Sequence, residues 1–191
     1  MDKSFLKNIA KGIFWRVYGG TVRNPPLPSK IKSVLFICLG NICRSPFAER
    51  IAAKYSNASN DIAFSSAGIR VDAPKPPPIE AIDSAKDFGV ELRDHASRQL
   101  QYGLMESHDI IITVEIWQYK YLKKMFMEFQ DKIFLLPLFC INNNISQNIY
   151  DKYNISDPYG RNYAAYDECF EKINKCINGL FHSINVSKKN K

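Results

Sequence analysis

Short apolar runs alternate with amphipathic segments from residue 33 to residue 181. The runs are rich in branched and aromatic side chains and predict four strands, at Ser33–Cys38, Ile62–Ser66, Asp109–Val114 and Lys132–Leu136. Between and after them, apolar residues at helical spacing predict helices over Pro46–Tyr55, Ile79–Phe88, Glu115–Phe129 and Tyr163–Phe181. Strand–helix alternation of this kind predicts an α/β domain with a mainly parallel sheet.

The N-terminal residues and the stretch after the fourth predicted strand have a different pattern. Residues 4–18 place Phe5, Ile9, Ile13 and Val17 at a spacing of four, which predicts an amphipathic helix, and the following 23–30 stretch is a Pro-rich linker. Residues 138–156 are Asn-rich and predict a loop. We therefore divide the chain into an N-terminal arm (1–32), a folded domain (33–185) and a basic tail (186–191).

Charge changes the interpretation of these ends. The net charge is +7, but residues 1–32 carry seven basic and one acidic side chain and the tail adds three lysines. Residues 33–187 contain 16 basic and 18 acidic residues, so the folded body is nearly neutral. A nucleic-acid binder needs a basic stripe on its folded surface or a recognisable motif. The sequence has neither, and we expect no nucleic-acid partner.

The sequence lacks a secretory leader and any run of about 18 apolar residues, which predicts a cytoplasmic protein with no membrane span. Its five cysteines are then expected to be free thiols. Cys140, Cys169 and Cys176 lack metal-ligand spacing with one another or with a histidine, so we expect core or surface thiols, and neither a metal nor a cofactor.

The turn after the first strand, CLGNICRS (38–45), carries the candidate chemistry. A loop between a parallel strand and a helix directs backbone N–H groups and the positive helix terminus at one point, which suits an anion. Gly40 and Asn41 tolerate positive φ, and the guanidinium of Arg44 can grip a phosphate with two hydrogen bonds. Cys38, at the start of the loop, is placed as a nucleophile whose thiolate form this field and Ser45 favour.

The sequence VLFICLGNICRSPFAE resembles the phosphate-binding loop of the low-molecular-weight protein tyrosine phosphatases, in their bacterial form. The resemblance continues through SSAG (65–68), HASRQL (95–100), the 109–114 strand and DPYG (157–160), and covers roughly residues 33–181. It implies a flavodoxin-like, three-layer α/β domain with a four-stranded parallel sheet, and metal-free phosphomonoester hydrolysis through a phosphocysteine.

The resemblance also implies roles for single residues. Cys38 matches the nucleophile, Arg44 the phosphate clamp and Asp157 the general acid. The rest of the phosphate-binding loop comprises Leu39, Gly40, Asn41, Ile42, Cys43 and Ser45. Ser66 and His95 match residues that support the loop through Asn41, and Cys43 matches a second cysteine that traps an oxidised nucleophile as a disulfide.

Asp157 has independent support. Expulsion of a tyrosine leaving group, whose pKa is near 10, requires a proton donor at neutral pH. A carboxylic acid supplies that proton and can then activate water, and Pro158 stiffens the loop that presents it.

Substrate choice depends on the residues around the loop. Related arginine phosphatases carry threonine where this chain has Ile42, and a bulky aliphatic side chain there suits a flat phenolic ring. Tyr159 is expected to form another wall. The chain departs from the family at Val114–Glu115, where Met-Asp is usual, and at Ile69, Arg70 and Asp72, which we place in the substrate slot. An arginine there favours acidic phosphopeptides.

The composition suggests an AT-rich bacterial genome, and bacterial relatives act on tyrosine kinases of capsule or exopolysaccharide export. A phosphotyrosine protein, such as a kinase, is thus the expected partner. Alternatives are phosphatase activity on another phosphomonoester or on phosphoarginine, and a non-catalytic phospho-binding protein. Residues 1–32 either pack on the domain or dock on a membrane surface or a kinase.

Overall fold

The computed structural model describes residues 22–56, 61–140 and 149–189. Four parallel strands form one sheet in the order β2-β1-β3-β4: β1 (Ser33–Cys38), β2 (Ala63–Gly68), β3 (Ile110–Thr113) and β4 (Ile133–Leu135). The chain moves from β1 to β2 on one side and then returns to β3 on the other. The carboxyl ends of β1 and β3 therefore meet where the strand order reverses, the usual position of a ligand site in such sheets.

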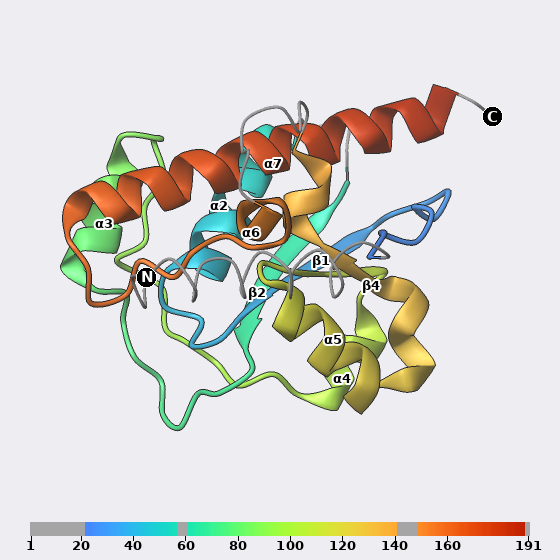
Figure 1. The fold of residues 1–191 in the computed structure, drawn as a ribbon, viewed down its shortest axis with the longest axis horizontal. Coiled ribbons are helices and arrows are strands. Elements are labelled where there is room, and N and C mark those ends of the chain that lie inside the picture. The colour runs from blue at the N-terminus through green and yellow to red at the C-terminus, as the bar shows by residue number, and fades with distance from the viewer. Residues whose placement is uncertain (1–21, 57–60, 141–148, 190–191) are drawn as a thin grey trace, which may run out of the picture.

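Helices cover both faces of the sheet, as Figure 1 shows. One face packs against α2 (Arg44–Tyr55), α3 (Ile79–Lys86) and the long α7 (Tyr163–Lys189). The other packs against α4 (Tyr102–Ser107), α5 (Ile116–Met125) and the 3-10 turn η1 (Met127–Lys132). A second 3-10 turn, η2 (Leu136–Phe139), and α6 (Ile149–Tyr153) follow β4. This confirms the predicted three-layer α/β fold.

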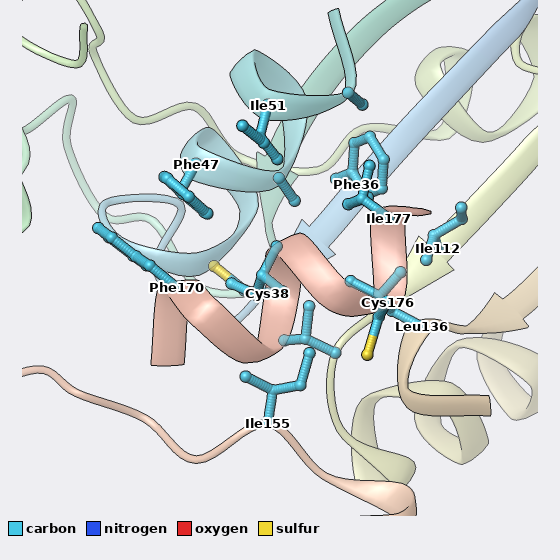
Figure 2. Close-up of a cluster of buried hydrophobic side chains, with 14 of the residues drawn as sticks. Phe36, Cys38, Phe47, Ile51, Ile112, Leu136, Ile155, Phe170, Cys176 and Ile177 are labelled. Carbon is cyan, nitrogen blue, oxygen red and sulfur yellow. The ribbon is translucent and has the colours of Figure 1, made fainter. Parts of the chain in front are cut away.

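Alternation along the strands divides the core into two. In β1, Val34 and Phe36 face α2 and α7, whereas Leu35 and Ile37 face α5. All four are fully buried, so the strand is apolar on both faces, as parallel strands between helical layers are. In the larger cluster, the ring of Phe47 stacks on that of Phe170 with centroids 4.0 Å apart, which joins α2 to α7 (Figure 2).

Several predicted bounds differ from the observed ones. The helix expected over Glu115–Phe129 ends at Met125, because Phe126 leaves the helical region (φ −129°, ψ 64°) and η1 begins. The short α4 and α6 lie in segments for which no helix was predicted. The C-terminal helix continues to Lys189. The helix predicted over residues 4–18 lies outside the described residues.

A disulfide between Cys140 and Cys176 joins the end of η2 to α7. The expectation that every cysteine is a free thiol is therefore wrong for this pair. The two residues are 36 positions apart in the sequence and meet only because η2 packs on α7. Cys38, Cys43 and Cys169 are free and buried. None of the described helices combines the length and apolar content that a membrane span requires.

Residues 22–32 run around the β4 edge of the sheet. Val22 packs on the α5 side, whereas Leu27 and Ile31 pack on the α7 side. Between them, the side-chain amide of Asn24 donates to the carbonyl of Leu135 (3.2 Å) and accepts from its N–H (2.7 Å). The amide thereby pairs with the exposed edge of β4 as a neighbouring strand would.

We predict that Asn24→Ala lowers the free energy of unfolding by about 1–2 kcal/mol, because both main-chain groups of Leu135 lose their partner. Denaturant titration checks the value. Asn178→Ala, which removes an exposed amide from α7, is the control and should change stability by less than about 0.5 kcal/mol. Equal effects of the two substitutions would contradict a role for Asn24 at the sheet edge.

Candidate active site

The 38–45 loop connects the carboxyl end of β1 to α2, and Asn41 holds its shape. Asn41 has φ 54°, and its side chain donates to Ser45 Oγ (2.9 Å) and Ser66 Oγ (2.8 Å). Its Oδ1 accepts the N–H of Arg98 (2.9 Å), and its carbonyl accepts His95 Nε2–H (2.8 Å). A carbonyl can only accept, so this bond fixes the proton of His95 on Nε2. Ser66 and His95 thus contact Asn41 as the sequence predicted.

Of the two residues expected to tolerate positive φ, Asn41 adopts it and Gly40 does not. A non-glycine residue in this region is strained unless its surroundings hold it. Five hydrogen bonds hold Asn41, since its own N–H also donates to Cys38, and its side chain is fully buried. A carboxylate that the sequence analysis missed extends this network, since Ser66 Oγ donates to Glu49 (2.6 Å). Glu49 lies four residues after Ser45, on the same face of α2.

The glycine that the site requires is Gly68, at the end of β2. A Cβ there would lie 2.6 Å from Val71 Cγ2 and 2.9 Å from the carbonyl oxygen of Leu39. The chain after Gly68 then binds the 38–45 loop directly: Ile69 N–H donates to the Cys38 carbonyl (3.0 Å) and Arg70 N–H to that of Leu39 (2.9 Å). Close backbone approach explains the glycine in SSAG.

Cys38 is 3% exposed and lies at the base of the loop. Its Sγ accepts the N–H of Asn41 (3.2 Å) and lies 3.0 Å from Ser45 Oγ. Since Ser45 Oγ already accepts a hydrogen bond from Asn41, its own proton is available for the sulfur. The helix α2 begins at the other end of the same loop. Hydrogen-bond donors from the loop and from Ser45 thus face the sulfur of Cys38.

Arg44 is the first residue of α2 and is 2% exposed. Its Nη1 forms an ion pair with Glu115 and donates to the carbonyl of Ile155 (3.1 Å), and its Nη2 lies 2.6 Å from Asp157 Oδ2. Burial alone would lower the pKa of Arg44, but Cys38, Asp157 and Glu115 outweigh it and raise that pKa. Arg44 is therefore a permanent cation beside Cys38.

Glu115 holds Arg44 although the sequence analysis gave it no role. It follows β3, and its carboxylate also accepts Trp117 Nε1–H (3.0 Å) and Gln118 Nε2–H (3.0 Å). It is 14% exposed, whereas Asp157 is 43% exposed. The only signal in the sequence was that Glu115 stands where the resembling family has aspartate.

A cleft of about 240 Å³ opens above the loop. Five residues were predicted for the substrate slot, and the structure places four of them at the cleft: Ile42, Arg70, Asp72 and Tyr159. Ile69 points away and packs on the α5 side of the sheet. The other lining residues are Cys38, Leu39, Gly40, Cys43, Arg44, Val71, Ala73, Lys75, Ser97 and Asp157.

Cys43 is buried beside this cleft. Burial is the largest cause that raises the pKa of Cys43, and the neighbouring Cys38 and Asp157 raise it further, so Cys43 is a neutral thiol. Among the described residues, no group of three His, Cys, Asp or Glu side chains is arranged to hold a metal ion.

Comparison with known proteins places these features in a family. A family model described as low molecular weight phosphotyrosine protein phosphatase matches residues 33–190. The tyrosine phosphatase Wzb of Escherichia coli K12 is 33% identical over 103 residues, which is 54% of this chain and 68% of Wzb. The structure of Vibrio vulnificus Wzb in complex with benzylphosphonate superimposes with a TM-score of 0.66 at 27% identity, covering 84% of this chain and 99% of that one. The YwlE arginine phosphatase from Geobacillus stearothermophilus shares the fold (TM-score 0.70, 22% identity, covering 83% of this chain and 96% of that one).

We predict that Gly68→Ala loosens the site, because the new Cβ overlaps Val71 and the carbonyl of Leu39. The free energy of unfolding should fall by about 1–3 kcal/mol, and the affinity for inorganic phosphate should fall with it. Denaturant titration and calorimetric titration with phosphate measure the two effects.

Gly103→Ala is the matched control, since a Cβ at Gly103 meets nothing within 4 Å. It should leave phosphate affinity unchanged and either leave stability unchanged or raise it by up to about 1 kcal/mol. A Gly68→Ala protein that binds phosphate like the wild type would refute the requirement for glycine.

Proposed function

The chain belongs to the low molecular weight phosphotyrosine protein phosphatase family, and we propose that it hydrolyses protein phosphotyrosine through a phosphocysteine on Cys38. The observation that carries the proposal is the convergence of a hydrogen-bonded thiolate site, a buried arginine and a half-exposed carboxyl group on one cleft. These are the nucleophile, the phosphate clamp and the acid that the reaction needs.

In the first step, the Cys38 thiolate attacks phosphorus and the bond between phosphorus and the phenolic oxygen breaks. Asp157 gives its proton to the departing oxygen, so that tyrosine leaves as a neutral phenol. Arg44 and the N–H groups of the loop stabilise the charge on the transferring phosphoryl group, which is the main task of a site for phosphoryl transfer.

In the second step, the Asp157 carboxylate takes a proton from water as the water oxygen attacks phosphorus. The sulfur–phosphorus bond breaks, inorganic phosphate forms, and Cys38 leaves as a thiolate. The hydroxyl of Ser45, 3.0 Å from Cys38 Sγ, stabilises that leaving thiolate. Cys38 and Asp157 thus act in opposite directions in the two steps, and water is the only reactant besides the substrate.

The ion pair between Arg44 and Asp157 has to open before a phosphate can bind. Nη1 of Arg44 remains held by Glu115 and the Ile155 carbonyl, so the guanidinium keeps its position. Nη2, which faces Asp157, is the group that then turns to the phosphate. In this scheme the bound phosphate replaces Asp157 on Arg44, and the released carboxylate takes from the phosphate monoanion the proton that it then gives to the leaving oxygen.

Phosphotyrosine fits the walls of the cleft better than phosphoarginine does. Ile42 and Tyr159 both line it and offer apolar surface to a phenyl ring. Phosphoarginine carries a charged, polar guanidinium, for which the apolar side chain of Ile42 supplies no hydrogen-bonding partner. A non-catalytic phospho-binding role is disfavoured, because such a protein has no use for a nucleophile and an acid on either side of the phosphate.

The physiological partner that we propose is a phosphotyrosine protein of the cytoplasm, specifically a tyrosine kinase of capsule or exopolysaccharide export. The relation to bacterial phosphatases such as Wzb supports this choice. Residues 22–32 pack on the domain, so docking on that kinase or on a membrane surface is a proposal for residues 1–21, which lie outside the described part of the chain.

Cys43 is proposed as a redox guard for Cys38. A peroxide would convert the Cys38 thiolate to a sulfenic acid, and the Cys43 thiol would then displace water to form a disulfide. Cys43 is buried in the same loop, five residues from Cys38, which supports this pairing.

The catalytic assignment predicts a distinct effect for each of two substitutions. Cys38→Ser should abolish hydrolysis of p-nitrophenyl phosphate, and Asp157→Asn should slow hydrolysis of phenyl phosphate by about 10²–10⁴-fold. The loss in Asp157→Asn should shrink with better leaving groups, because these need less protonation. Steady-state kinetics test both. Turnover that survives Cys38→Ser, or a wild type without vanadate-sensitive activity, would overturn the proposed function.

The charge at the rim predicts a preference among peptides. Arg70, Asp72 and Lys75 line the cleft and are the charged residues of the loop after Gly68. This part of the cleft therefore carries a net positive charge. We expect Arg70→Ala to lower kcat/KM for a phosphotyrosine peptide flanked by Asp and Glu by about 3–10-fold and to leave an alanine-flanked peptide unchanged.

Arg93→Ala removes an exposed arginine that does not line the cleft, and it should affect neither peptide. If Arg70→Ala acts equally on the acidic and the neutral peptide, Arg70 does not select flanking acids.

A further inference from the structure

The segment that presents Asp157 begins with a helix too short to be stable alone. After β4 and η2, the next described element is α6, which has five residues and precedes Asp157. An isolated helix of that length is unstable, and its last carbonyl groups have no partner within the helix. Something outside α6 has to fix the position from which the acid loop starts.

Lys172, on α7, makes that contact. Its Nζ donates to the carbonyl of Asp151 (2.9 Å) and to that of Asn154 (2.9 Å), and it lies 3.7 Å from Asp151 Oδ1. Asp151 lies in α6 and Asn154 directly follows it, so both carbonyls are at the carboxyl end of that helix, where a positive charge is favourable. The side chain is 27% exposed, and burial lowers the pKa of Lys172 while Asp151 opposes the change. A lysine is held in such a place by its hydrogen bonds.

Downstream of this contact the chain is tied to the end of β3. Asn154 Oδ1 accepts the N–H of Ile116 (3.2 Å), and Ile155 N–H donates to the carbonyl of Val114 (2.9 Å). Asp157 follows two residues after Ile155. The acid therefore extends from a short piece of chain that the end of β3, Arg44 and Lys172 all hold, and Lys172 is the polar contact supplied by α7.

We propose that Lys172 is a positioning residue for the general acid: it fixes the end of α6 so that Asp157 reaches the leaving oxygen. The inference rests on the proposed function. Lys172 itself has no contact with the substrate in this proposal. The helix α7 then has two roles: its apolar face packs against the sheet, and the polar side chain of Lys172 orders the loop that carries Asp157.

The test is the dependence of kcat/KM on the leaving group. For a series of aryl phosphates of rising phenol pKa, Lys172→Met should match the wild type on the best leaving groups and fall about 5–30-fold below it on the poorest. In an Asp157→Asn background the same substitution should have no further effect, because a misplaced acid and an absent acid are equivalent. Inhibition by inorganic phosphate should be unchanged in both backgrounds.

Lys175→Met is the matched control, since Lys175 lies on the same helix and, within the described residues, its Nζ pairs with the exposed Glu171. It should retain wild-type kinetics throughout the series. Thermal melting verifies that each variant is folded. If Lys172→Met does not fold, Lys172→Gln replaces it in the test. The glutamine keeps an amide donor group, so the loss of activity on poor leaving groups should be smaller.

Two outcomes separate the inference from the function on which it rests. The first outcome assumes that the wild type shows a reaction that depends on Cys38 and Asp157. If Lys172→Met then loses activity equally on all leaving groups, or if its loss adds to that of Asp157→Asn, Lys172 has a general structural role and the inference is wrong. If the wild type shows no Cys38-dependent turnover, the proposed function fails and the inference fails with it.

Discussion

The buried guanidinium of Arg44 is the interaction on which the rest of the site depends. It joins the start of α2 to the chain after β3, through Glu115, and to the chain after α6, through Ile155 and Asp157. These three segments follow different strands and meet only at the reversal of strand order. Removal of one partner from a buried ion pair costs about 3–5 kcal/mol, since the remaining charge is left without compensation. The position of every reacting group is thus coupled to a single cation.

Much of the fold could be predicted from the sequence because its strands are apolar on both faces and its helices are long. The four strands and the helices at α2, α3 and α7 were predicted with bounds that differ by a few residues, apart from the extension of α7. The short elements were missed for a physical reason. α4 and α6 have five or six residues and are held by contacts from elsewhere, such as those of Lys172 on α6, so their own periodicity is too brief to detect.

The candidate site was predictable where it is contiguous. The 38–45 loop carries its own signal, but its supports are set by the packing of distant segments. Nothing near Glu115 indicated that it would meet Arg44, 71 residues away, and no spacing pointed to the disulfide between Cys140 and Cys176. Ile69 shows an error that the pattern could have prevented. Ala67 faces the α5 side of the sheet, and a residue two positions later in an extended chain has the same orientation.

The two carboxylates on Arg44 differ in a way that assigns their tasks. Glu115 is 14% exposed and is held by Trp117 and Gln118 as well, so its departure would leave several buried groups without partners. Asp157 is 43% exposed, and water can replace its contact at little cost. In the proposed reaction, the pair that opens for a phosphate is therefore the outer one. A fixed inner carboxylate and a releasable outer one would let a single arginine both hold the fold of the site and exchange a partner during catalysis.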